Sequence, residues 1–377
     1  MTVPSRVRPS SVALTVGLTL LIASPVLADD DEEPWYKKVE LHAFVSSVYS
    51  YNFNDPVSGT SQLRVFDSEH DNFDIDGEFV VLMPVKDGGD AGFRMDLEAG
   101  STIPRLEAAR GLFRDPETGK AEDVDLQQAF VSYIAPIGNG LRFDFGKCVT
   151  PAGAELIEGY DGYNDLHTHS FLFGYAIPFT HTGIHITYPW SDHFSSKLLI
   201  LNGWDNVKDN NDGKTVGIQF AVTTDKVSFY VQDIYGPEQD DNTSNKRQLC
   251  DLVGVFKLGG SFTLTGNVDI ASEEGVAADG GTANWSGAAL SARWDATDKF
   301  ALSFRAERFK DDDGVRTGNA QTLTEFTICP SVKLGKGFVL RGDLRLDSSD
   351  IDAFEKDREG EFTDHQASLS LNALFAF

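Results

Sequence analysis

The last thirteen residues, HQASLSLNALFAF (365–377), alternate between apolar and polar side chains over most of their length. The apolar face holds Ala367, Leu369, Leu371, Ala373, Phe375 and Phe377, and the polar face holds Gln366, Ser368, Ser370 and Asn372. A strand that crosses a bilayer needs about 9–11 residues in which lipid-facing apolar positions alternate with polar ones. The stretch is therefore long enough to span a membrane as a β-strand.

The aromatic residue at the end of this strand, Phe377, resembles the assembly signal of outer-membrane β-barrels. The alternative is the edge strand of a soluble β-sandwich, which would use shorter strands whose apolar faces meet in one core. The rest of the chain favours the barrel, because long alternating segments recur through it. They are clear in residues 39–53, 72–83, 91–99, 216–222, 227–231, 262–270, 288–294, 300–306, 326–332 and 338–346, and weaker around 124–135, 182–188, 195–204 and 248–258.

The connections between these segments alternate in length. Short ones, rich in the Gly, Asp, Asn and Pro that tight turns require, fall at 86–90, 136–140, 189–194, 224–226, 258–261, 295–299 and 334–337. Longer polar ones fall at 54–71, 102–123, 150–177, 205–213, 236–247, 272–284, 310–321 and 347–363. We therefore predict an all-β chain that forms a transmembrane, antiparallel, up-and-down β-barrel of 16 strands, with short periplasmic turns and long external loops.

The N-terminal residues have the features of a secretory signal peptide. Arg6 and Arg8 precede an apolar run from Val12 to Ile22, and the segment closes on small residues at Ala28. The run is too short to cross a bilayer and is followed by acidic residues; the alternative is an uncleaved N-terminal helix. We expect residues 1–28 to be a cleaved signal peptide, 29–38 a short periplasmic segment and 39–377 the barrel, located in the outer membrane of a Gram-negative cell.

The composition argues against several other classes of protein. The chain carries 32 basic and 58 acidic residues, a net charge of −26, so nucleic acid is not an expected partner. Three cysteines are too few for a disulfide-stapled domain, and we expect no bridge. No phosphate-binding loop, HExxH or GxSxG pattern occurs, so we expect neither an enzyme nor a cofactor.

Charged side chains fall on the polar face of the expected strands. The basic residues that we expect to line a pore wall are Arg94, Arg142, Arg305, Arg341 and Arg345, and Arg293 has the same parity. An Arg or Lys near the bilayer midplane would cost about 2–4 kcal/mol, so charges of one parity predict a hydrated lumen. Three charges break the parity, and we expect each at the external end of its strand, where the cost is small: Lys147, Asp233 and Arg308.

The longest connection, residues 150–177, is the expected determinant of selectivity. It holds Glu155, Glu158, Asp161 and Asp165. Folded into the lumen, it would oppose these carboxylates to the wall arginines and form a constriction that filters by size and by a transverse field. The alternative is a solvated external loop. His167 and His169 of this connection are candidate metal ligands, but polar lumen histidines are the favoured interpretation, so we expect no metal site.

Several motifs around this connection resemble the OmpL-like family of β-barrel porins. They are Phe145-Gly146-Lys147, Gly153-Ala154-Glu155, Ser170-Phe171-Leu172-Phe173, the run from Tyr175 to Gly183, Asn202-Gly203-Trp204-Asp205-Asn206, and Ala129-Phe130-Val131-Ser132-Tyr133 upstream. The resemblance extends over the mature chain and implies an outer-membrane barrel with porin function. Cys148 and the sequence His167-Thr168-His169 depart from the family pattern, which leaves the preference of the pore open.

These features together predict a porin, a water-filled channel for passive diffusion of small hydrophilic solutes and ions. We expect modest cation selectivity, because acidic residues outnumber basic ones in the loops and the lumen. Alternative roles for such a barrel are a lipid-modifying enzyme, an adhesin or the sheath of an electron-transfer complex. The expected partners are outer-membrane lipid and lipopolysaccharide, the barrel-assembly machinery and further copies of the chain in a homotrimer.

Overall fold

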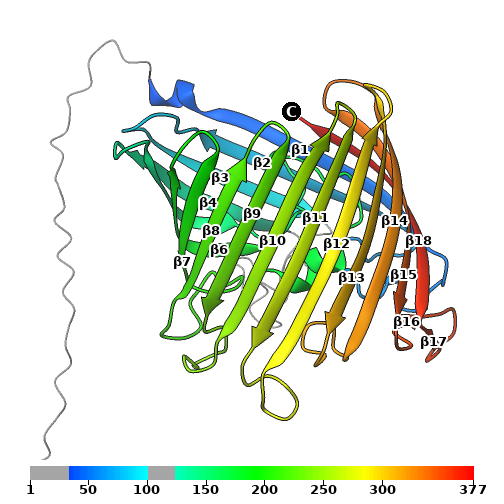
Figure 1. Ribbon diagram of the computed structural model, residues 1–377. Helices are drawn as coiled ribbons and strands as arrows, with labels where there is room; N and C mark the ends of the chain where they lie inside the picture. Colours follow the sequence, from blue (N-terminus) through cyan, green and yellow to red (C-terminus); the bar gives the residue numbers. More distant parts are fainter. Residues whose placement is uncertain (1–33, 101–123) are drawn as a thin grey trace, which may run out of the picture. The chain divides into compact units, whose positions relative to one another are not determined.

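The computed structural model describes residues 34–100 and 124–377. Sixteen strands form one closed barrel in which each strand pairs antiparallel with its two neighbours (Figure 1). The prediction of a 16-stranded antiparallel barrel is confirmed. The expected signal peptide (1–28) and residues 29–33 of the expected periplasmic segment lie outside the described residues. The expected long connection 102–123 lies outside them as well.

The barrel strands follow the chain in order. They are β1 (Glu40–Asn52), β2 (Asn72–Met83), β3 (Ala91–Gly100), β4 (Val124–Ala135), β5 (Leu141–Val149), β6 (Thr180–Pro189), β7 (Phe194–Leu201), β8 (Thr215–Thr223), β9 (Val227–Gly236), β10 (Arg247–Leu258), β11 (Phe262–Glu273), β12 (Ala283–Asp295), β13 (Phe300–Asp311), β14 (Gln321–Lys333), β15 (Phe338–Ser349) and β18 (His365–Ala376). The short strands β16 (Phe354–Glu355) and β17 (Phe362–Thr363) pair in the last loop, and the helical turns are η1 (Trp35–Lys38) and η3 (Leu172–Ala176). No helix within the described ranges is long and apolar enough to cross a membrane.

The barrel closes between the first and last strands. β1 pairs with β18 from Phe44 opposite Ala376 to Asn52 opposite Ser368. Beyond this ladder, the backbone of Ala43 exchanges two hydrogen bonds of 3.0 Å with Phe377. The alternating strand directions gather the seven short turns at one end, here the turn end, and the longer connections that the structure describes at the other, here the loop end (Figure 1).

Strand β15 illustrates how the two faces of the wall differ. Leu340, Leu344 and Leu346 point outward and are 39–51% exposed. Arg341 and Arg345 alternate with them, point inward and are at most 4% exposed. The outer face is therefore apolar, as contact with lipid requires, and the inner face is polar.

One irregularity interrupts the wall between β3 and β4. Asp96 pairs with Gln128 and the next residue, Leu97, pairs with Leu126, so Gln127 is an extra residue in β4. Gln127 and Gln128 are both buried, because a bulge places two consecutive side chains on the same side. This explains why the apolar and polar positions of residues 124–135 alternate only weakly.

Lys147 lies near the loop end of β5, as expected, but its side chain is buried and does not face lipid. Its side chain is 4% exposed, and its ammonium donates hydrogen bonds to Asp125 Oδ2 at 2.6 Å and to the carbonyl oxygen of Leu126 at 2.9 Å. Asp125 lies in the part of β4 that precedes the bulge and is close enough to neutralise the charge. The ammonium is thus stabilised by an ion pair and not by a position at the lipid boundary.

Replacing Phe377 by serine should lower the yield of assembled barrel. The ring is 66% exposed, so its loss removes little packing within one chain, and a defect would reflect recognition during assembly. Heat-modifiable migration of outer-membrane fractions on gels measures the yield. The control is Phe362→Ser, which replaces a 48% exposed aromatic ring in the last loop. Equal yields of the two variants would contradict the assigned role of the C-terminal residue.

Candidate functional site in the barrel interior

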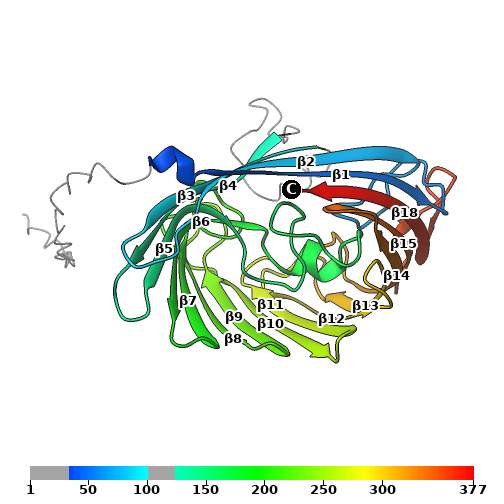
Figure 2. The ribbon, with the colours of Figure 1, turned by 90° about the horizontal axis from the view of Figure 1, so that it is seen from above.

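The connection between β5 and β6, here called the third loop (residues 150–179), lies inside the ring of strands (Figure 2). Inward side chains of the wall hold its first residues. Gln219 Nε2 donates to the carbonyl oxygen of Pro151 at 2.9 Å. The amides of Gly153 and Ala154 donate to Asp251 and Asn267, each at 3.1 Å. The loop therefore descends along β8, β10 and β11 within the lumen.

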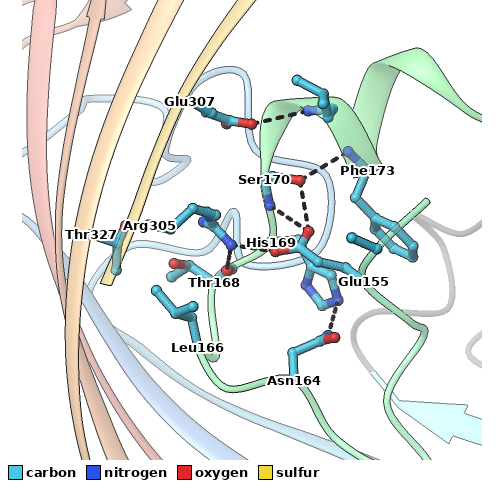
Figure 3. A network of polar contacts seen from close by, with 12 residues as sticks. Glu155, Asn164, Leu166, Thr168, His169, Ser170, Phe173, Arg305, Glu307 and Thr327 are labelled. Atoms are coloured by element: carbon cyan, nitrogen blue, oxygen red, sulfur yellow. Dashed lines mark hydrogen bonds and ion pairs between the residues drawn. The ribbon is translucent and has the colours of Figure 1, made fainter. Parts of the chain in front are cut away.

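Glu155 lies in a buried polar network at the start of the loop (Figure 3). One carboxylate oxygen pairs with Arg305, and the other accepts hydrogen bonds from the amide and hydroxyl of Ser170 at 2.8 and 2.7 Å. Arg305 also donates to the carbonyl oxygen of Thr168 at 2.7 Å and to Glu325 at 2.9 Å. The guanidinium thus joins β13, β14 and both ends of the third loop.

The charge of Glu155 is stabilised where it lies. Burial raises the pKa of this carboxyl, but Arg305, His169 and the two hydrogen bonds from Ser170 outweigh it, so the pKa lies below its ordinary value. The carboxylate is therefore ionised at neutral pH and pairs with a guanidinium that is only 1% exposed.

The other three acidic residues of the loop also contact arginines of the wall. Glu158 pairs with Arg341, Asp161 with Arg94 through two contacts of 2.8 Å, and Asp165 with Arg293 at 2.6 Å. The pair of Glu158 with Arg341 is nearly buried, at 10% and 1% side-chain exposure. Asp161 and Asp165 are more open, at 52% and 42%. All four acidic residues are therefore engaged with the wall.

The predicted wall arginines are not equivalent. Arg94, Arg305, Arg341 and Arg345 contact the third loop, the last through the carbonyl oxygen of His169. Arg142 instead donates to Asp144 at 2.9 Å and to Ser132, both on neighbouring wall positions. Arg293 also contacts the third loop, through Asp165, but it was not among the predicted wall arginines. Its position on the polar face of the strand was the sequence signal that could have identified it.

These contacts change the expected electrostatic arrangement. We predicted that acidic residues of the loop face the wall arginines across an opening. The charges instead lie in direct contact, so they neutralise one another locally and no passage runs between them. The sequence identifies which side chains face the lumen. The position of the loop relative to the wall depends in addition on hydrogen bonds within the loop.

These hydrogen bonds lie in a hairpin at the loop tip. The side-chain amide of Asn164 accepts from the amide of Leu156 at 3.0 Å and donates to its carbonyl oxygen at 2.8 Å. Between them, Gly159 and Gly162 exchange two backbone hydrogen bonds. The tip reaches the opposite wall, where Tyr160 donates its amide proton to Glu78 at 2.5 Å and stacks on His42 with ring centroids 3.8 Å apart. The third loop thus spans the lumen.

An apolar core fills part of the interior toward the loop end. Its buried residues include Phe66 of the first loop (residues 53–71), Phe171, Phe173 and Ile177 of the third loop, Trp204 of the fourth, and Trp285 of β12. The inward position of the first loop was not predicted. Arg64 of this loop also enters the interior and pairs with Asp347 at 2.7 Å. The core fixes the end of the third loop, because Trp285 Nε1 donates to the carbonyl oxygen of Ala176 at 3.1 Å.

Arg316 of the loop between β13 and β14 adds a second tie to the same segment. Its Nε donates to the carbonyl oxygen of Tyr175 at 2.6 Å, and its guanidinium lies 5.3 Å from the ring centroid of Trp285. Asp205 of the fourth loop, which joins β7 to β8, accepts the amide proton of Phe179 at 2.5 Å. The first loop, the fourth loop and the loop between β13 and β14 therefore all contact the third loop.

Two cavities remain beside the third loop, on the side of strands β1 to β5. The first, of about 410 Å³, is lined by Phe44, Ser46, Phe66, Asp67, Asp76, Glu98, Ile157, Glu158, His167 and His169. The second, of about 450 Å³, is lined by residues that include Glu78, Gln128, Glu155 and Asp161. The described lining of both cavities contains carboxylates and no Lys or Arg.

The two histidines considered as metal ligands contact different groups. His167 Nδ1 lies 3.4 Å from Arg341 Nη2, and His169 Nε2 lies 3.1 Å from Asn164 Nδ2. Within residues 34–100 and 124–377, no group of three or more His, Cys, Asp or Glu side chains could hold a metal ion. The cysteines Cys148, Cys250 and Cys329 are all free.

Comparisons with known proteins agree with this architecture. The family described as "Putative beta-barrel porin-2, OmpL-like" matches residues 38–377. No curated protein sequence matches the chain.

Several solved outer-membrane proteins are similar in fold. The channel DcaP of Acinetobacter baumannii is 10% identical, with a TM-score of 0.59 and coverage of 90% of this chain and 97% of that one. The anion-selective porin of Comamonas acidovorans is 13% identical, with a TM-score of 0.57 and coverage of 90% and 99%. The trimer form of OmpT of Vibrio cholerae is 10% identical, with a TM-score of 0.58 and coverage of 90% and 99%.

A double-mutant cycle on Glu158 and Arg341 should reveal strong coupling. Each single change to glutamine leaves a buried charge without its partner, whereas the double variant removes both charges. We expect a coupling free energy of about 0.5–3 kcal/mol from thermal midpoints of barrel unfolding. The exposed pair Arg358 and Glu361, at 74% and 46% side-chain exposure, is the control and should show little coupling. Additive effects at Glu158 and Arg341 would mean that the observed contact does not hold the loop.

Proposed function

Because the chain belongs to the OmpL-like family of β-barrel porins, we propose that it forms a water-filled channel for passive diffusion of small hydrophilic solutes and ions. The observation that carries this proposal is a loop that crosses a charged lumen inside a wall with an apolar outer face. Charged groups facing inward keep the lumen hydrated, and a loop across it limits the size of what passes.

Within this proposal, the third loop is the constriction. Glu155, Glu158, Asp161 and Asp165 act first as anchors, because each pairs with an arginine of the wall. The anchors place the loop tip against β1 and β2, next to the two cavities. Solutes would pass through this space and not between the loop and the arginines.

The proposed selectivity follows from which charges remain unopposed. Arg305, Arg341 and Arg345 are at most 4% exposed and are engaged by the third loop, so they present little positive potential to a passing ion. Glu78 and Glu98 line the cavities on the other side of the loop. We therefore assign the channel a modest preference for cations.

The apolar outer face supports the remaining assignments. Lipid and lipopolysaccharide would cover the exposed apolar side chains of the strands, and the assembly machinery would recognise the C-terminal strand. A homotrimer is the proposed assembly, since OmpT of Vibrio cholerae, which is similar in fold, has a trimer form.

Reversal potentials across a salt gradient test the selectivity. The purified barrel in planar bilayers should prefer K⁺ over Cl⁻ at low salt. The preference should fade as salt rises, since charges are screened over about 10 Å at 0.1 M. A chloride preference at low salt would contradict the proposal, because it would mean that the arginines act on the passing ion despite their partners.

Shortening the third loop tests the constriction. Residues 157–163 can be replaced by two glycines, because Asn164 already holds Leu156 at hydrogen-bond distance and the ends of the excised hairpin are adjacent. Single-channel conductance should rise clearly, whereas removing the exposed residues 357–360 from the last loop should leave it unchanged. Heat-modifiable migration verifies that both barrels assemble. Unaltered conductance of an assembled loop-tip variant would refute the constriction.

A further inference from the structure

The first cavity beside the third loop has a polar lining whose hydrogen-bonding capacity is only partly used. Its space of about 410 Å³ includes open solvent, and it is lined by β1 to β3, the first loop and the third loop. The lining contains the four carboxylates Asp67, Asp76, Glu98 and Glu158 and the two imidazoles His167 and His169. Asp67 pairs with Arg64 and Glu158 with Arg341, whereas no Lys or Arg is among the described lining residues themselves.

Buried polar atoms without partners surround this space. Asp67 Oδ1 and Glu98 Oε2 have no hydrogen-bond partner within the described part of the chain, and their residues are 8% and 3% exposed. His167 Nε2 and His169 Nδ1 are also buried and unpartnered. Buried polar groups in proteins are almost always satisfied by protein, water or a ligand, so four such atoms around one cavity indicate an occupant.

The carboxylates define which groups the occupant must carry. Asp67 and Glu98 offer acceptor oxygens, so the occupant must donate protons to them, and a cationic donor makes the stronger bond. Phe66 and Phe44 add ring surface to the lining, against which the apolar part of an organic ion can pack.

His167 contributes a donor to the lining. Its Nδ1 faces the guanidinium of Arg341, which can only donate, so Nδ1 accepts and the neutral ring carries its proton on Nε2. Burial and the neighbouring Arg341 lower the pKa of this imidazole, so it is neutral. Ammonium and guanidinium groups have no acceptor for this N–H, so the acceptor oxygens of Asp67 and Glu98 alone select the occupant.

We propose that this cavity is a binding subsite for a small organic cation bearing ammonium or guanidinium groups, placed beside the route through the channel. The subsite rests on the proposed channel function. A single metal ion does not explain it, since no three of the described side chains are placed to ligate one.

Channel block tests the subsite with three compounds of similar length. Agmatine is a dication with one guanidinium and one ammonium group, glutarate is a dianion and 1,4-butanediol is neutral. Agmatine should reduce the K⁺ current through the purified barrel reversibly and in a concentration-dependent way, and the other two should not. Equal effects of all three compounds would overturn the subsite, because obstruction would then not depend on charge.

The matched variants are Glu98→Gln in the cavity and Glu359→Gln in the exposed last loop. Losing one charge-assisted hydrogen bond should weaken agmatine block by about tenfold in the first variant and leave it unchanged in the second. Asp76→Asn replaces the first variant if Glu98→Gln does not assemble. Block that is unaffected by the cavity variant would overturn the site.

The controls separate the subsite from the channel. A normal K⁺ current with no response to agmatine overturns the subsite alone and means that water fills the cavity. Absence of any K⁺ current in an assembled barrel overturns the proposed channel function and the subsite with it.

Discussion

Closure of the sheet between β1 and β18 is the constraint on which the rest of this structure depends. A wall in hydrocarbon must satisfy every backbone donor and acceptor within itself, and the ladder that ends at Ala43 and Phe377 completes the ring. Closure also separates two environments. Apolar side chains must face outward, and most charges on the strands are directed into a common interior. The interior must then supply partners for these charges.

The third loop supplies most of those partners. An arginine buried without a partner is costly, so Arg305 and Arg341 favour a conformation in which Glu155 and Glu158 reach them. The loop carbonyl oxygens of Thr168 and Asn164 accept further hydrogen bonds from these two guanidiniums, and that of His169 accepts one from Arg345. The same contacts that fix the loop also remove the positive charge from the lumen. The position of the loop and the proposed selectivity therefore have one physical origin, and a change in either member of a pair would alter both.

Much of the fold could be predicted because a spanning strand repeats every two residues and each turn has a recognisable composition. The two-residue repeat does not reveal a bulge, so the buried neighbours Gln127 and Gln128 made β4 hard to interpret. The burial of Lys147 was not predicted for a related reason, since its partner Asp125 lies on the segment before that bulge. Periodicity describes one strand at a time, whereas an ion pair depends on two.

The interior was predictable only in part. Parity identified the arginines, and the length and acidity of residues 150–177 identified the loop. Direct pairing could not be anticipated, because it depends on the brace between Asn164 and Leu156 and on the contacts of the tip with Glu78 and His42. Arg64 and Phe66 carried no signal, since nothing in a polar external loop marks the residues that turn inward.

The apolar core at the loop end connects these observations. Phe66, Phe173 and Trp285 come from the first loop, the third loop and the wall, and they meet inside a barrel whose inward strand positions are mostly polar. Such a core is possible only because the third loop occupies the lumen and excludes water from these rings. The apolar core in turn holds the loop on the side of β9 to β14, and the two cavities with their carboxylates lie on the side of β1 to β5. The hydrophobic effect therefore determines, indirectly, which charges line the cavities beside the loop.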